Sequence, residues 1–124
     1  MKYLIDTNIF LWFIFKDRRL PTYIRTILED ERSLIILSIA SLFEITIKVT
    51  KGGLLPNIDL GDFFQSHVVD AGLKILPIQI NHLLTLRTLP FHHYDPFDRL
   101  IISQSLTEDI ELLYTDAFWV PNFS

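Results

Sequence analysis

Four short apolar runs alternate with stretches of helical periodicity along the chain, and this alternation is its most restrictive feature. The runs are residues 2–6 (KYLID), 34–37 (LIIL), 74–77 (KILP) and 112–114 (LLY). Each run is consistent with one buried strand. Strands that alternate with helices build a parallel sheet with helices on both faces. The pattern therefore predicts an α/β fold with a parallel sheet of four or five strands.

The segments between the runs have the marks of helices. We expect helices over residues 7–15, 21–31, 38–50, 60–71, 79–87 and 95–107. Thr7 or Asn8 is expected to cap the first helix, and Pro21 suits the first turn of the second. The chain has 124 residues and no repeat or low-complexity segment, so we expect one domain over 1–124.

Composition and charge narrow the classes of function. The chain has no cysteine, which excludes disulfides, thiolate metal sites and cysteine nucleophiles. Its N-terminal apolar run contains Asp6 and ends at Lys16, so it is shorter than the roughly 20 residues of a membrane helix. We therefore expect a cytoplasmic protein without a membrane partner. The net charge is −4, so any contact with a nucleic-acid backbone has to be local.

Two aspartates stand at or directly after the predicted strands. Asp6 ends the first strand, and Asp116 follows the last one. Each alone could be a turn or cap residue. In open parallel sheets, however, ligands bind beyond the carboxyl ends of the strands. Two aspartates at two such ends favour a shared site.

A polar stripe runs along the otherwise apolar helix over residues 38–50. Ser41, Glu44 and Lys48 are spaced so that they share one face of this helix. A solvated Glu–Lys pair would explain two of them. A helix this apolar is mostly buried, however, and a buried carboxylate needs a partner or a metal ion. The stripe therefore favours a site at Glu44.

The segment HHYDPFDRLI carries two more acids at a helix start. Asp95 falls at the N-cap, because Pro96 suits the first helical position. Asp98 lies one turn further, and we expect it to bind metal while Asp95 caps the helix. The competing interpretation is a capping box that uses both residues. His92 and His93 lack the spacing of a metal motif, and we expect them to shape the loop.

Several carboxylates at one sheet edge cannot all stay ionised without a cation. Hard oxygen ligands suit Mg²⁺ or Mn²⁺. Such a site supports phosphodiester hydrolysis by an activated water. No glycine-rich phosphate loop is present, and no histidine stands in a triad-like context with Ser41. These observations favour a metal-dependent hydrolase.

Four segments together resemble PIN-domain proteins. LIDTNIFLWF is similar to the opening of that family, and SIASLFEITIKVTKGGL to the segment that carries its glutamate. HHYDPFDRLIISQS is similar to the helix start with its third acid, and LLYTDAF to its final strand and aspartate. The segments occur in the family's order. The likeness is closest to VapC-type toxins of toxin–antitoxin pairs.

The resemblance implies a Rossmann-like PIN domain that cleaves single-stranded RNA with Mg²⁺ or Mn²⁺. It implies dimerisation, as a homodimer, and a cognate antitoxin. The implied metal-binding and catalytic acids are Asp6, Glu44, Asp98 and Asp116. Thr7 and Asn8 are expected to orient Asp6, and Lys48 and Arg99 are candidate phosphate contacts. Ser41 is expected in one of these two roles.

Two alternatives stay open at this point. One is a PIN fold with weak or no catalysis that acts as a binding module. The other is a haloacid-dehalogenase-like phosphatase, in which an aspartate is expected two residues after Asp6, where this chain has Asn8. An apolar surface for a partner protein is also expected around Trp12, Phe13 and Phe15.

Overall fold

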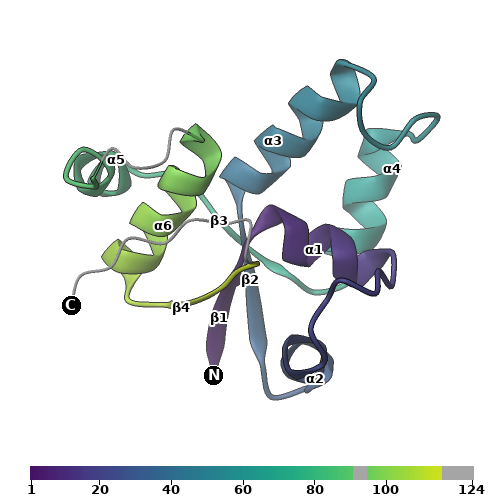
Figure 1. Cartoon of the computed structure of the whole chain (residues 1–124), viewed down its shortest axis with the longest axis horizontal. Helices are drawn as coiled ribbons and strands as arrows, with labels where there is room; N and C mark the ends of the chain where they lie inside the picture. The colour runs from purple at the N-terminus through teal and green to yellow at the C-terminus, as the bar shows by residue number, and fades with distance from the viewer. Residues whose placement is uncertain (91–94, 116–124) are drawn as a thin grey trace.

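All four predicted strands form one parallel sheet. The computed structural model describes residues 1–90 and 95–115. Within these ranges the strands are β1 (Lys2–Ile5), β2 (Leu34–Ser38), β3 (Lys74–Leu76) and β4 (Glu111–Leu113). Their order in the sheet is β3-β2-β1-β4, with every neighbouring pair parallel (Figure 1). The predicted α/β fold with a parallel sheet is confirmed.

Helices cover both faces of this sheet. They are α1 (Thr7–Ile14), α2 (Thr22–Glu29), α3 (Ile39–Thr50), α4 (Leu60–Phe64), the π-helix η1 (Gln65–Val69), α5 (Ile80–Leu86) and α6 (Pro96–Glu108). Residues from α1, α2, α4 and η1 share one apolar cluster, and residues from α6 belong to the other. No helix in the described ranges is long and apolar enough to cross a bilayer.

The alternation of side chains along the central strands creates the two apolar clusters. Successive side chains of a strand point to opposite faces of the sheet. Tyr3 and Ile5 of β1 therefore join the cluster under α1 and α2, while Leu4 joins the cluster under α6. Helix α3 serves both clusters, because Ile45 lies in the first and Ala40 in the second. Burial of both faces explains why the strands are largely apolar, apart from the exposed Lys2, Lys74 and Glu111 that begin three of them.

The start of α1 differs from the prediction. Asp6 is the N-cap, and its side chain accepts a hydrogen bond from the backbone N–H of Ile9. The predicted caps, Thr7 and Asn8, lie inside the helix instead. At α6 the prediction is confirmed, since Asp95 is the N-cap and Pro96 the first helical residue.

A buried polar network joins α5 and α6 to the end of β2. His82 is fully buried, and its Nδ1 accepts from the backbone N–H of Gln79 at 2.9 Å. Its Nε2 therefore carries the proton and donates to Glu108 at 2.8 Å. Gln104 accepts a short hydrogen bond from the hydroxyl of Ser38, at the end of β2. The network fixes α6 relative to the strand end from which α3 begins.

We expect Leu4→Ala to lower the free energy of unfolding by about 2–5 kcal/mol, because Leu4 is fully buried between the sheet and α6. Leu106→Ala on the exposed side of α6 is the matched control and should change stability by about 0.5 kcal/mol or less. Urea unfolding followed by circular dichroism measures both. Equal losses in the two variants would contradict this packing.

Candidate active site

The carboxylate of Asp6 is fixed by two backbone N–H groups. Asp6 is buried at the carboxyl end of β1. One oxygen accepts from Ile9 at 2.7 Å, in the first turn of α1. The other accepts from Thr115 at 3.0 Å, two residues beyond β4. Asp6 therefore links the ends of β1 and β4, and its own position is rigidly set.

Glu44 projects from α3 towards the start of α1. It is buried, and its Oε1 accepts a hydrogen bond from the hydroxyl of Thr7 at 2.7 Å. The hydroxyl of Thr7 also lies 2.9 Å from that of Ser41. The second carboxylate oxygen of Glu44 is paired with Lys48 at 2.8 Å. Thr7 thus positions Glu44, whereas the sequence suggested that it would orient Asp6.

The two acids at the start of α6 differ in their contacts. One oxygen of Asp95 accepts from the backbone N–H groups of Phe97 and Asp98, at 2.9 and 3.0 Å. Its predicted role as the cap is confirmed. Asp98 lies in the first turn of α6 and is half-buried.

Three carboxyl groups share one electrostatic environment. The pKa of Asp6 is raised from 3.8 to about 6, and burial is the largest cause. Hydrogen bonds from Ile9 and Thr115 lower this pKa, while the charges of Asp98 and Glu44 raise it further. Asp6 therefore lies within electrostatic range of both Glu44 and Asp98. Asp116, the fourth predicted acid, lies outside the described residues, as do His92 and His93.

The chemistry of these groups fits a hard cation. Carboxylate oxygens are the ligands that Mg²⁺ and Mn²⁺ prefer, and each oxygen can accept more than one bond. The buried hydroxyl of Thr115, beside Asp6, has no hydrogen-bond partner in the described part of the protein. In residues 1–90 and 95–115, however, no three acidic or histidine side chains are close enough to hold one ion.

The two predicted phosphate contacts lie in different surroundings. Arg99 is buried and donates to the backbone carbonyl oxygens of Pro90, Leu86 and Leu89, at 2.6, 3.3 and 3.3 Å. These bonds hold the chain before α6 and argue against a phosphate contact. The side chain of Lys48 is 55% exposed, although it pairs with Glu44. Asn8 is half-buried in the first turn of α1.

The sequence did not predict an aromatic pair that joins α3 and α6. Phe43 of α3 is 55% exposed and meets Phe97 of α6 edge to face, with ring centroids 5.5 Å apart. Each ring comes directly before a candidate acid, Glu44 or Asp98. An aromatic residue directly before each acid was the available signal, but sequence alone does not show that the two rings meet.

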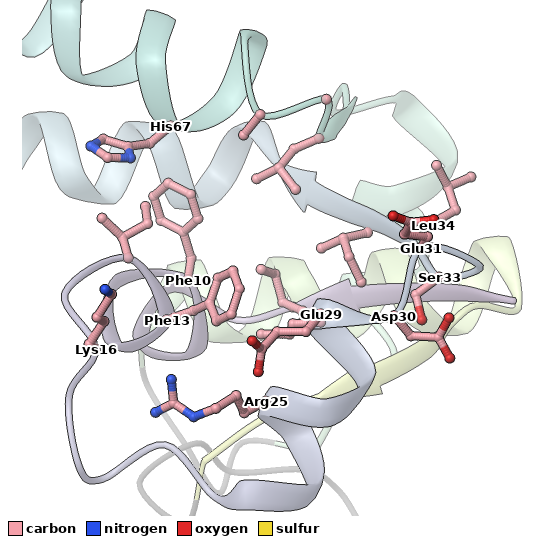
Figure 2. A pocket seen from close by; sticks show the side chains of 17 residues that line it. Phe10, Phe13, Lys16, Arg25, Glu29, Asp30, Glu31, Ser33, Leu34 and His67 are labelled. Carbon is pink, nitrogen blue, oxygen red and sulfur yellow. The ribbon is translucent and has the colours of Figure 1, made fainter.

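A cavity of about 580 Å³ lies between α1 and α2 (Figure 2). Its walls come from α1, α2, the start of β2 and the segment after η1. They include Phe10, Phe13 and Leu28, with Arg25 and His67 among the polar groups. Asp6, Glu44 and Asp98 do not line it. The cavity is therefore separate from the candidate active site.

The apolar surface predicted from α1 adjoins this cavity in part. Phe13 lines the cavity, while Phe15 is half-exposed and stacks on Phe63. Trp12 is only partly buried, and the guanidinium of Arg19 lies over its ring at 4.8 Å. Side chains of this helix thus leave apolar area accessible.

Comparison with protein-family models matches residues 3–117 to the PIN domain. The chain belongs to the PIN domain family. This assignment explains the order of the four motifs and removes the basis for the phosphatase alternative. A search of curated proteins gave no match.

Two solved structures have the same PIN fold. One is VapBC2 from Rickettsia felis bound to a DNA fragment from its promoter, with a TM-score of 0.64 and 20% identity. That match covers 90% of this chain and 86% of the other. The second is FitAB bound to an IR36 DNA fragment, with a TM-score of 0.57, 14% identity and coverage of 98% and 99%. At these identities the likeness concerns the fold.

We expect Asp95→Ala to lower the free energy of unfolding by about 0.5–2 kcal/mol, because the first turn of α6 loses its cap. Asp98→Ala should cost less stability but should sharply weaken Mn²⁺ binding. Chemical unfolding and calorimetric Mn²⁺ titration of both variants provide the test. The reverse ranking in the two measurements would show that the roles of these acids are exchanged.

The raised pKa of Asp6 predicts a pH dependence of stability. Below about pH 6 the folded protein keeps a proton on Asp6, while the unfolded chain, with a pKa of 3.8, does not. The contribution of Asp6 to the free energy of unfolding therefore increases as the pH falls from about 6 to about 4. Asp6→Asn cannot titrate, so the stability of the wild type relative to this variant should rise over that range. Parallel pH profiles in urea unfolding would refute the shift.

Proposed function

We propose that this PIN domain is a metal-dependent endoribonuclease that cleaves single-stranded RNA, and that it is the toxin of a toxin–antitoxin pair. The observation that carries the nuclease proposal is that Asp6 is buried at the carboxyl end of β1 and that the next residue, Thr7, binds the buried Glu44. The charges of Glu44 and Asp98 also raise the pKa of Asp6. Membership of the PIN family supports the nuclease proposal. Likeness to the VapBC2 and FitAB assemblies supports the toxin role.

The proposed cofactor is Mg²⁺ or Mn²⁺, held by Asp6, Glu44, Asp98 and Asp116. Such an ion, when bound, activates a water and neutralises charge on the leaving oxygen. The protein's own part is to hold the acids in place. The backbone N–H groups of Ile9 and Thr115 fix Asp6, and the hydroxyl of Thr7 fixes one oxygen of Glu44.

Lys48 gives the site a mobile positive charge. Its ammonium neutralises Glu44 in the present structure, and its side chain is largely exposed. A cation on Glu44 would weaken that ion pair, because both positive charges compete for one carboxylate. Lys48 would then be available to contact an RNA phosphate. In this proposal Lys48 acts on the substrate, and Arg99 holds the fold.

The proposed protein partners are a cognate antitoxin and a second copy of this chain. The VapBC2 and FitAB assemblies, each bound to DNA, motivate the antitoxin. Accessible apolar area on α1 is suited to an amphipathic helix of such a partner. The proposal of a homodimer rests only on the resemblance to VapC-type toxins.

One observation favours a second candidate, a PIN fold that binds RNA without cutting it. In the described residues, the acids are satisfied by hydrogen bonds and an ion pair, and three of them do not converge on one point. The two candidates differ in whether RNA is shortened when Mn²⁺ or Mg²⁺ is added.

We expect Asp6→Asn and Glu44→Gln to abolish cleavage of single-stranded RNA in the presence of Mn²⁺. Thr7→Val should lower it by about 10–100-fold, because Glu44 loses the hydroxyl that orients it. Asp62→Asn, an exposed acid of α4, is the control and should cleave normally. Gel assays measure cleavage, and circular dichroism checks folding. If the wild type cleaves no RNA with either ion, the binding module is the correct function.

A further inference from the structure

In the aromatic pair of Phe43 and Phe97, the side chain of Phe43 is accessible to solvent. Phe43 is 55% exposed although it lies in the middle of a well-packed helix, while Phe97 is half-buried. Their rings meet at 86°, the edge-to-face arrangement that aromatic pairs prefer. This contact restrains the ring of Phe43 without covering it. The protein therefore presents a flat, pre-positioned apolar surface.

This surface lies on the two helices that carry Glu44 and Asp98. Phe43 directly precedes Glu44 on α3, and Phe97 directly precedes Asp98 on α6. The first turns of α6 lie beside α3 (Figure 1), and the ring contact joins these two elements. A group that stacks on Phe43 would therefore lie where the two helices that carry Glu44 and Asp98 meet.

The charges around the pair indicate what that group is. The chain carries a net charge of −4, and the neighbouring acids repel phosphate. Electrostatic attraction, the usual source of affinity for nucleic acids, is therefore weak here. Stacking of bases on aromatic rings supplies affinity without charge and tolerates any base. The exposed ring of Phe43 offers a base such a stacking face.

We propose that Phe43, braced by Phe97, stacks one unpaired base of the RNA beside the bond that is cut. This inference rests on the proposed function and adds the feature of the substrate that is recognised. A base in a duplex has both faces covered by its neighbours, so only a single strand can offer one to Phe43. The pair thereby explains how a negatively charged site selects unpaired RNA.

The test compares binding of two fluorescent RNAs of about 12 nucleotides. One is oligouridylate, and the other has the same phosphates but no bases. Binding is measured by fluorescence anisotropy in the presence of EDTA, which removes divalent ions and so prevents cleavage. Phe43→Ala should weaken binding of oligouridylate by about fivefold or more, the range found for one stacked base. Phe43→Trp should bind as the wild type does, and Phe43→Leu should resemble Phe43→Ala.

The matched control is Tyr23→Ala, which removes a 66% exposed aromatic ring from α2, at the far end of the molecule from α3. It should bind both RNAs as the wild type does. Phe43→Ala should also bind the RNA without bases normally, because that ligand has nothing to stack.

Several results would overturn the proposal. They are no binding of oligouridylate by the wild type, an unchanged affinity in Phe43→Ala, or an equal loss for both RNAs. A change of oligomeric state in Phe43→Ala with normal RNA binding would instead assign the ring to a protein interface. If the wild type cleaves no RNA but Phe43→Ala still weakens binding of oligouridylate, the proposed ribonuclease function is refuted and the stacking proposal stands. If the wild type cleaves RNA but Phe43→Ala binds oligouridylate normally, the stacking proposal is refuted and the proposed function stands.

Discussion

The bridging of Asp6 between two backbone N–H groups is the interaction on which the site depends. One carboxylate oxygen caps α1, and the other holds the chain after β4. The same side chain therefore closes the carboxyl edge of the sheet and begins the helix that carries Thr7. Its burial has a cost, because the charged carboxylate loses water, and this raises its pKa to about 6. The fold thus stabilises a group that is electrostatically unfavourable at neutral pH.

The remaining acids are held by contacts of different strength. Glu44 is buried and bonded to a threonine and a lysine, whereas Asp98 is half-buried in the first turn of α6. A cation would reduce the repulsion among the three and would compete with Lys48 for Glu44. The same region carries an exposed aromatic ring, so the proposed chemistry and the proposed recognition of RNA share one edge of the sheet. The network from His82 through Gln104 to Ser38 fixes α6 to that edge.

The two exposed apolar surfaces, for which different functions are proposed, are formed by different residues. Phe43 contacts α6, while the cavity beside Phe13 is lined neither by Phe43 nor by Asp6, Glu44 or Asp98. A partner protein bound at the cavity would not have to compete with RNA for Phe43. It could still influence the site through α1, since the N-cap of this helix is Asp6 and its first residue holds Glu44.

The sequence by itself determined the strands, most of the helices and the order of the motifs, because burial on both faces makes the strands largely apolar and some helix starts carry local capping chemistry. It also determined the roles of Asp95 and Pro96, which depend on neighbours in the chain. It could not determine that Asp6, rather than Thr7 or Asn8, caps α1, or that Thr7 contacts Glu44 and Arg99 holds backbone carbonyls. Thr7 and Glu44 are 37 positions apart in the chain, and Asp6 is also held by Thr115, 109 positions away, so only the packing of the tertiary structure decided these contacts.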